Sequence, residues 1–156
     1  MLELIVMLQT YLPMKQFRDK SRSKYFFDNH YFDSSWELAY YIWLVDKGIT
    51  FEYHPNVFFE YTIQGDDKVH KYFPDFLVDG KFVEIKGDDQ IKNGTMIDKC
   101  NHEKNLVAQA KYNCMLANNI LILLGKDIKP YLRYVFQKYG KSYISSYRIS
   151  TKKGIE

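Results

Sequence analysis

The 156-residue sequence predicts a mixed α/β fold, in which one central sheet is flanked by helices. Two observations carry this prediction. Segments with helical spacing and apolar-rich runs bounded by turn residues follow one another in the order helix, antiparallel strands, helix, strand, helix. In addition, 46% of the residues are hydrophobic, which is enough apolar material for one core. We therefore expect a single domain.

The first helix is expected to follow Ser34 or Asp33, either of which can cap it. It should continue to about Lys47, because Gly48 occupies the position at which glycine commonly ends a helix. Three strands should come next, at residues 49–54, 57–63 and 69–78. Residues 64–67 form the expected turn between the last two of these strands.

A hairpin is expected where Asp79-Gly80 separates two apolar-rich runs. This dipeptide is typical of a two-residue turn, because both turn positions need a positive φ. Residues 81–86 then form the second strand of the hairpin. Residues 87–101 are polar and are expected to be a loop near the substrate.

The last predicted elements are a helix at 103–118, a buried strand at 120–124 and a final helix at 128–139. The helix at 103–118 should bury an apolar stripe of Leu106, Ala110, Cys114 and Ala117.

The chain divides into three parts of one domain. Residues 1–31 are an N-terminal apolar segment and a basic arm, 32–125 the core, and 126–156 a C-terminal helix and basic tail. The apolar segment should form a short helix or strand that ends at Pro13. Its leucines at positions 4, 8 and 12 could also be buried in a homodimer.

The hairpin turn also predicts which residues face each other across the two strands. Val78 should pair with Lys81, and the register then continues outward until Asp75 faces Glu84. Two carboxylates about 5 Å apart repel by roughly 3 kcal/mol at an effective dielectric constant of ~20. A divalent cation between them would turn that repulsion into coordination.

Lys86 lies two residues beyond Glu84 and should therefore point to the same face of the sheet. By the same alternation, Tyr72 is assigned to the opposite, apolar face. The carboxylate face is itself apolar elsewhere, at Phe73, Leu77 and Phe82. Charges in a strand pair that is apolar on both faces favour a functional site over a solvated sheet surface.

The pattern Pro74-Asp75, eight residues, then Glu84-x-Lys86 resembles the PD-(D/E)XK nuclease superfamily. With SSWE-L-A upstream, YFPDF and VEIKG, the chain is similar to small endonucleases of bacteriophages and mobile elements, of the junction-resolving or homing type. The resemblance covers roughly residues 32–125. It implies a restriction-endonuclease-like fold, a mixed sheet core flanked by helices, and metal-dependent phosphodiester cleavage.

The resemblance also implies roles for individual residues. Asp75 and Glu84, with the Ile85 carbonyl, would hold one or two Mg²⁺ ions, for which Mn²⁺ is expected to substitute. Lys86 would orient or activate the attacking water and offset charge on the phosphate. Members commonly place a further glutamate on the helix before the sheet, and Glu37 matches that position.

Glu37 has two explanations. It stands three residues after Ser34 and could complete a capping box, which is a structural role. It is also the only charged residue from Trp36 to Val45, in a helix that we expect to be buried. Because a lone buried carboxylate needs a partner, a metal-linked or water-linked role is favoured, and both roles could coexist.

Basic residues gather at the two ends of a chain whose net charge is +3, whereas the middle is acidic. An acidic middle suits a cation site, and basic flanks suit a polyanion such as DNA. The expected DNA contacts are Lys15, Arg18, Lys20, Arg22, Lys24, Lys104, Lys111 and Lys141. Each of these side chains could instead be solvated surface.

Other chemistry has less support. Cys100, His102 and Cys114 would supply only three ligands to a structural zinc ion, which needs four, so Cys114 is better explained as a core cysteine. No phosphate-binding glycine pattern is present, so no nucleotide cofactor is expected.

The expected location is the cytoplasm, or the host cytoplasm if a phage encodes the protein. No run of 18 or more apolar residues predicts a membrane span, and the N-terminus lacks the features of a signal peptide. Two cysteines suggest a reducing compartment.

The sequence thus predicts a Mg²⁺-dependent endodeoxyribonuclease. Two alternatives are a non-catalytic nucleic-acid-binding protein on a nuclease fold, and a transposase-type nuclease subunit that cuts only with a partner. The pattern is compatible with a junction, a specific duplex site or a single strand as the target.

Overall fold

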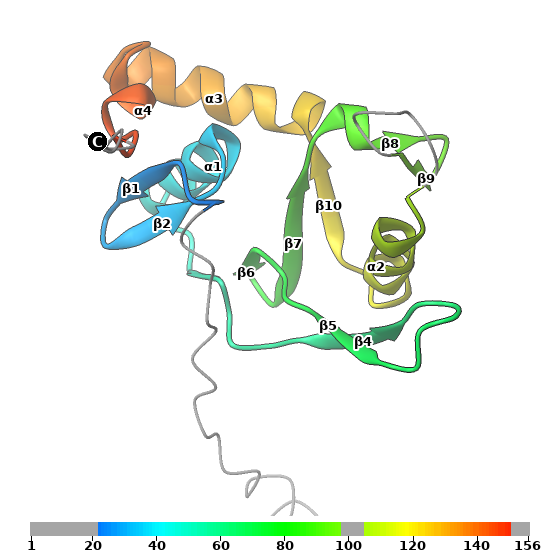
Figure 1. The fold of residues 1–156 in the computed structure, drawn as a ribbon. Helices are drawn as coiled ribbons and strands as arrows, with labels where there is room; N and C mark the ends of the chain where they lie inside the picture. The colour runs from blue at the N-terminus through cyan, green and yellow to red at the C-terminus, as the bar shows by residue number, and fades with distance from the viewer. Residues whose placement is uncertain (1–21, 98–104, 151–156) are drawn as a thin grey trace, which may run out of the picture.

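A four-stranded sheet forms the centre of the protein in a computed structural model that describes residues 22–97 and 105–150. Its strand order is β10-β7-β6-β3, and β10 runs parallel to β7 whereas the other neighbours are antiparallel. The strands are β3 (Phe51–Tyr53), β6 (Phe76–Val78), β7 (Lys81–Lys86) and β10 (Leu121–Leu124). Helices flank this mixed sheet (Figure 1), so the predicted α/β class is confirmed.

The β6–β7 hairpin forms in the predicted register. Its pairs are Phe76↔Val83, Leu77↔Phe82 and Val78↔Lys81. Asp79 and Gly80 have φ values of 47° and 76°, which is the conformation that the two-residue turn requires. The local turn signal was therefore sufficient to set the pairing.

The single strand that we predicted at 69–78 is wrong, because the structure divides it. β5 (Val69–Tyr72) ends before Phe73, and β6 begins only at Phe76. Pro74 lies in the interruption, and proline has no N–H to donate to a strand partner. β5 pairs instead with β4 (Phe59–Thr62) in a separate two-stranded sheet.

Helix α1 (Ser35–Asp46) begins and ends where the sequence predicted. The Ser34 hydroxyl oxygen accepts a hydrogen bond from the Glu37 N–H at 3.2 Å, which caps the first turn. Gly48 follows the helix with a φ of 63°. The residue types at both ends therefore explain the length of α1.

Helix α3 (Gly125–Tyr139) lies beside α1, and the short helix α4 (Tyr143–Ser146) follows it (Figure 1). We predicted that α3 would begin at Ile128, but it begins at Gly125. The Asp127 carboxylate accepts a hydrogen bond from the Leu124 N–H at 2.9 Å, and this contact caps an earlier first turn.

One face of the sheet packs against α1, α3 and α4 through Phe76, Val83 and Ile85. The hairpin of β1 (Tyr25–Phe27) and β2 (His30–Phe32) packs on the same core. We had assigned most of this hairpin to the basic arm and had predicted no strands there. Asp28 and Asn29 adopt φ values of 49° and 57°, so this dipeptide forms the turn that the prediction missed.

The other face packs against helix α2 (Leu106–Ala117) and the β4–β5 sheet. This second core contains Tyr72, Cys114, Met115 and Ile120, with Phe82 and Ile122 packed against it. Cys114 is a buried free cysteine, as predicted. The predicted apolar stripe of α2 is wrong at its ends, because Leu106 is 64% exposed and Ala117 is also exposed.

The segment after β7 is not a plain loop. It contains a 3₁₀ turn, η3 (Asp88–Gln90), and a hairpin of β8 (Ile91–Lys92) with β9 (Thr95–Met96). Asn93 and Gly94 form the hairpin turn with positive φ values of 49° and 74°. Within the described residues, no helix is long and apolar enough to cross a membrane.

Candidate active site

Glu84 and Lys86 project from β7 toward the side of the sheet that α2 covers. Val83 and Ile85, which alternate with them, point into the core formed by α1 and α3. Glu84 is buried, and the Lys86 Nζ lies 2.9 Å from its Oε1 atom. The predicted placement of Glu84 and Lys86 on one face is confirmed.

Asp75 joins this pair from the segment just before β6. Its Oδ2 atom accepts a hydrogen bond from the Ile85 N–H at 2.9 Å, and its carbonyl accepts one from the His54 N–H at 2.8 Å. The predicted cross-strand pairing of Asp75 with Glu84 is wrong, because the β6–β7 ladder ends at Phe76. A side-chain oxygen, rather than the backbone of Asp75, contacts β7.

The carboxylates of Asp75 and Glu84 nevertheless influence each other strongly. Burial, the charge of Glu84 and then the charge of Glu37 raise the pKa of Asp75 well above its ordinary value. The Ile85 N–H and Lys86 act in the opposite direction but do not offset these effects. The site therefore has excess negative charge, which either a proton or a cation would relieve.

Lys86 stays positively charged in this environment. Burial alone would lower the pKa of its ammonium group, but Glu84, followed by Asp75 and Glu37, raises that pKa above the ordinary value. A lysine of this kind can orient a water molecule or stabilise charge on a phosphate. It is poorly suited to accept a proton.

Glu37 lies in the first turn of α1 and is 9% exposed. Its carboxylate accepts hydrogen bonds from the Ser34 hydroxyl at 3.1 Å, the Tyr53 hydroxyl at 3.2 Å and the Asp33 N–H at 3.4 Å. Glu37 therefore has a structural role at the start of α1, where it accepts from the cap hydroxyl and from the N–H of the residue before the cap. The charge of Glu37 also raises the pKa of Asp75, which places Glu37 in the same electrostatic environment. Its metal-linked role stays a prediction.

Lys111 of α2 belongs to the same electrostatic environment. Burial and the charge of Lys86 lower the pKa of Lys111, whereas Glu84 and Asp75 act to raise it. Among the described residues Lys111 forms no ion pair. Lys111 could have been a phosphate contact or solvated surface. Its burial and its interactions with Lys86, Glu84 and Asp75 favour a place at the site.

Tyr72 is a site residue that the sequence reasoning missed. Its hydroxyl donates a hydrogen bond to the Glu84 Oε2 atom at 2.8 Å, although we had assigned Tyr72 to the opposite face. The assignment failed because it extended the alternation of a strand through residues 73–75, where the strand is broken. The tyrosine itself was a usable signal, because a buried phenol usually finds a hydrogen-bond partner.

A hollow of about 530 Å³ opens beside the site. It is lined by Ser34, Trp36, Glu37, Ile85, Lys86, Gly87, Asp88, Asp89 and Gln90. Gly87 allows the Asp89 carboxylate to approach the backbone closely, because a Cβ there would lie 2.6 Å from the Asp89 Oδ1 atom. Asp88 and Asp89 were also missed, although they directly follow the motif in sequence.

The oxygen donors of the site suit a hard cation. Within the described residues, no group of three or more His, Cys, Asp or Glu side chains is arranged to hold a metal ion. The predicted donors are the carboxylates of Asp75 and Glu84 and the Ile85 carbonyl, with Glu37 expected to complete a second metal site or to hold a metal-bound water. Mg²⁺ is commonly bound through one or two carboxylates while it keeps several waters, so these donors fit it.

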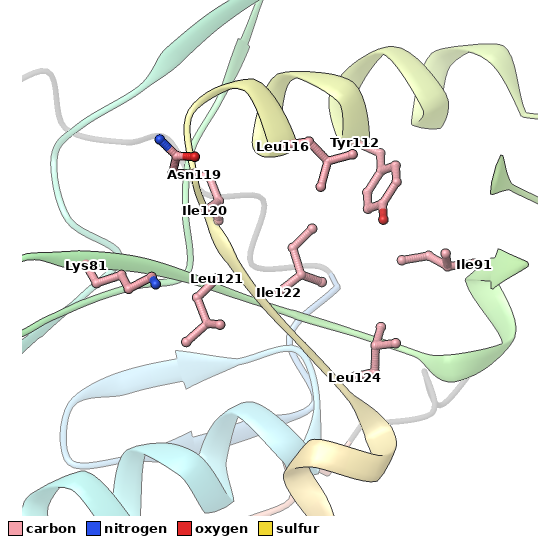
Figure 2. Close-up of a pocket in the computed structure, with 9 residues that line it drawn as sticks. All are labelled: Lys81, Ile91, Tyr112, Leu116, Asn119, Ile120, Leu121, Ile122 and Leu124. Carbon is pink, nitrogen blue, oxygen red and sulfur yellow. The ribbon is translucent and has the colours of Figure 1, made fainter. Parts of the chain in front are cut away.

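A second hollow, of about 430 Å³, lies between β10 and α2 (Figure 2). Aliphatic side chains such as Leu116, Ile122 and Leu124 line it, together with Tyr112 and Lys81. No carboxylate lines this hollow among the residues that the structure describes. It therefore offers mainly packing surface, and its described lining provides no carboxylate to hold a metal ion.

The predicted DNA contacts divide into three groups. Lys15, Arg18, Lys20 and Lys104 lie outside the described residues, as do the leucines at 4, 8 and 12, Cys100 and His102. Arg22, Lys24 and Lys141 are exposed and do not line the hollow beside Lys86. Only Lys111 is brought to the carboxylates among the described members.

Comparisons of this chain with protein-family models, with curated proteins and with solved structures gave no match. The resemblance to the nuclease superfamily therefore rests on the motif residues alone.

Proposed function

We propose that this protein is a metal-dependent endonuclease that hydrolyses phosphodiester bonds in DNA. The observation that carries the proposal is the meeting of Asp75, Glu84 and Lys86 at β7. The Lys86 ammonium group lies 2.9 Å from the buried Glu84 carboxylate, and the half-buried Asp75 carboxylate interacts with both charges. A packing role gives no reason for this concentration of charge.

Mg²⁺ is the proposed cofactor, with Mn²⁺ as a substitute. Asp75 and Glu84, with the Ile85 carbonyl, would hold it, and Glu37 would contribute through a water or at a second ion. The bound ion would supply Lewis-acid polarisation of the phosphate group. Its charge would also offset the repulsion that raises the pKa of Asp75.

The protein side chains would provide orientation and charge. In hydrolysis the water oxygen bonds to phosphorus, the phosphorus–oxygen bond to the leaving sugar breaks, and the leaving oxygen takes up a proton. Lys86 would hold the attacking water or stabilise the phosphate oxygens as their charge increases. Lys111 would contact the same phosphate from α2.

DNA binding outside the site would depend on the basic residues of the two flanks. Lys129, Arg133 and Lys141 surround a shallow hollow on the outer side of α3, together with Phe136. These basic side chains would contact phosphates away from the reaction, whereas Asp75 and Glu84 would hold the metal ion. A protein encoded by a phage or a mobile element would encounter such DNA in the cytoplasm of its host.

The test is cleavage of three DNA substrates of matched sequence: a branched junction, a linear duplex and a single strand. Purified protein with Mg²⁺ should cut at least one of them, and EDTA should prevent the reaction. The Glu84→Gln variant, purified in parallel, controls for a contaminating nuclease. Binding without cleavage by the wild type would contradict the proposal and favour a non-catalytic nucleic-acid-binding protein.

A transposase-type subunit is separated from this proposal by the same assay. The endonuclease that we propose cuts as the purified protein alone. Cleavage that appears only after a cellular extract is added, and that Glu84→Gln abolishes, would instead indicate a required partner.

A further inference from the structure

Tyr72 is a polar side chain in an apolar environment. The residue is fully buried at the end of β5, within the core that also contains Cys114, Met115 and Ile120. A phenylalanine would fill the same space without introducing a hydroxyl that requires a partner. The hydroxyl therefore calls for an explanation beyond packing.

That explanation lies in its contact with Glu84. The Tyr72 hydroxyl donates to Oε2 at 2.8 Å, while the Lys86 Nζ lies 2.9 Å from Oε1. The phenol supplies the hydrogen of this contact, and the Glu84 carboxylate oxygen accepts it. The carboxylate is consequently held from two sides, by one group on its own strand and by another on β5.

The ring of Tyr72 has a second contact. The Lys111 Nζ lies 5.4 Å from the centre of the ring, within the range of a cation–π interaction. Lys111 has no ion-pair partner among the described residues, so the ring, together with the charges of Glu84 and Asp75, favours its charged form. One side chain thus touches both the carboxylate proposed as a metal ligand and the lysine proposed to contact phosphate.

We propose that Tyr72 is a positioning residue of this site, whose hydroxyl orients the Glu84 carboxylate for a cation and whose ring supports Lys111. The inference rests on the proposed function and extends it to a residue outside the motif. Groups that hold a metal ligand in place commonly change metal affinity or activity by about 10- to 100-fold when removed.

Two substitutions separate the two contacts. Tyr72→Phe removes the hydroxyl and keeps the ring, so Mg²⁺ binding should weaken while DNA binding in EDTA stays near that of the wild type. Tyr72→Leu removes the ring as well, and should also weaken DNA binding in EDTA. Tyr61→Phe is the matched control, because Tyr61 lies on the adjacent strand β4 and packs against the same core.

The experiment is a titration of the DNA-free protein with Mg²⁺ alone, followed by thermal unfolding. Tyr72→Phe should raise the Mg²⁺ concentration at half-maximal stabilisation by about tenfold. Tyr61→Phe should leave this concentration unchanged. Equal half-maximal concentrations in Tyr72→Phe and wild type would overturn the inference, since a packing role alone predicts that result.

The titration also separates this inference from the proposed function. A wild type that binds Mg²⁺ but cuts none of the DNA substrates would overturn the nuclease proposal, and the titration would still decide the role of Tyr72. A wild type that cuts DNA with Mg²⁺ but that Mg²⁺ alone does not stabilise would overturn the Tyr72 inference and leave the nuclease proposal standing. Unchanged DNA binding in Tyr72→Leu would overturn the part that concerns Lys111.

Discussion

Asp46 and Asp75 are two carboxylates in opposite situations within one small domain. Asp46, at the end of α1, accepts hydrogen bonds from the Lys138 Nζ at 3.0 Å, the Tyr134 hydroxyl at 3.1 Å and the Tyr139 hydroxyl at 2.9 Å. Burial alone would raise the pKa of Asp46, but these donors hold it below its ordinary value. Asp75 is surrounded by further carboxylates, and its pKa is raised.

The difference shows which of the two is built for stability. Each of these hydrogen bonds to Asp46 comes from α3, so the carboxylate joins two helices and its charge is well matched. Asp75 has one backbone N–H donor among the described residues and competes with Glu84 for the charge of Lys86. A carboxylate held in that condition is available for a ligand, whereas Asp46 is not.

The largest expected effect is the loss of cleavage when a carboxylate of the candidate site is replaced, and it tests the contrast between Asp75 and Asp46. Asp75→Asn or Glu84→Gln should reduce cleavage by about a thousandfold or more, because loss of the cation removes several kcal/mol of transition-state stabilisation. Asp46→Asn is the matched control and should leave cleavage unchanged. Single-turnover rates with Mg²⁺ measure the effect, and near-wild-type rates in Asp75→Asn would contradict the proposed mechanism.

Lys86 and Lys138 provide the corresponding test with cations. Lys86→Ala should lower the cleavage rate at saturating DNA by about a hundredfold, yet leave DNA affinity close to that of the wild type, since its role is in the transition state. Lys138→Ala, which removes an exposed partner of Asp46, should change neither quantity. If DNA affinity falls as much as the rate in Lys86→Ala, then Lys86 is only a phosphate contact.

Glu37 should give a smaller effect. Glu37→Gln keeps a side chain that can accept from Ser34 and thus preserves the cap, but it removes the charge near Asp75. We expect about a tenfold loss of cleavage rate, with little change in thermal stability. Wild-type rates in this variant would leave only the structural explanation of Glu37.

The pH dependence of stability should differ in sign between the two aspartates. The raised pKa of Asp75 means that the folded, metal-free protein holds this proton more tightly than the unfolded chain does. Its contribution to the free energy of unfolding is fully present below the unfolded pKa of about 3.9 and is lost as the pH rises through the folded pKa. The Asp75→Asn variant should not show this loss of stability with rising pH.

The lowered pKa of Asp46 has the opposite consequence. Its contribution is present above the unfolded pKa and is lost as the pH falls through the folded pKa. Asp46→Asn should therefore flatten the acid side of the stability profile. Denaturant unfolding in EDTA across a pH series measures how the free energy of unfolding changes with pH in each variant. If both variants changed this pH dependence in the same direction, the contrast between Asp46 and Asp75 would be refuted.

The smallest effects are expected from the exposed cations. Replacing Arg22 and Lys24, or Lys129, Arg133 and Lys141, by serine should reduce the salt dependence of DNA binding. The log–log slope should change by about 0.9 for each phosphate that the variant no longer neutralises. The cleavage rate at saturating DNA should not change.

Point substitutions are needed because truncation from Lys141 would remove Ile144 from the core. Unchanged slopes in both variants would show that these cations are solvated surface.

Local signals predicted several parts of the fold well. Ser34 and Gly48 determine where α1 begins and ends, and Asp79-Gly80 sets the β6–β7 register. Each acts locally, Ser34 through its hydroxyl and the other residues through a positive φ. The turns Asp28-Asn29 and Asn93-Gly94 carry the same kind of signal. They were missed because the basic arm shows little periodicity and because the polar composition after β7 favoured a loop.

The candidate site was predictable only as far as one strand extends. Glu84 and Lys86 share a face because alternation within β7 requires it, and the structure places them in an ion pair. The same reasoning failed for Asp75 and Tyr72. Both were assigned by extending the alternation through residues 73–75, and Pro74 interrupts the strand there.

The sequence by itself determined the ends of α1, the β6–β7 hairpin and the shared face of Glu84 and Lys86, because these depend on residues a few positions apart. The tertiary structure alone decided that Tyr72 donates to Glu84 and that Lys111 lies over the Tyr72 ring. Those contacts join β5, β7 and α2, whose relative placement depends on the packing of a whole core. Neither turn chemistry nor periodicity contains that information.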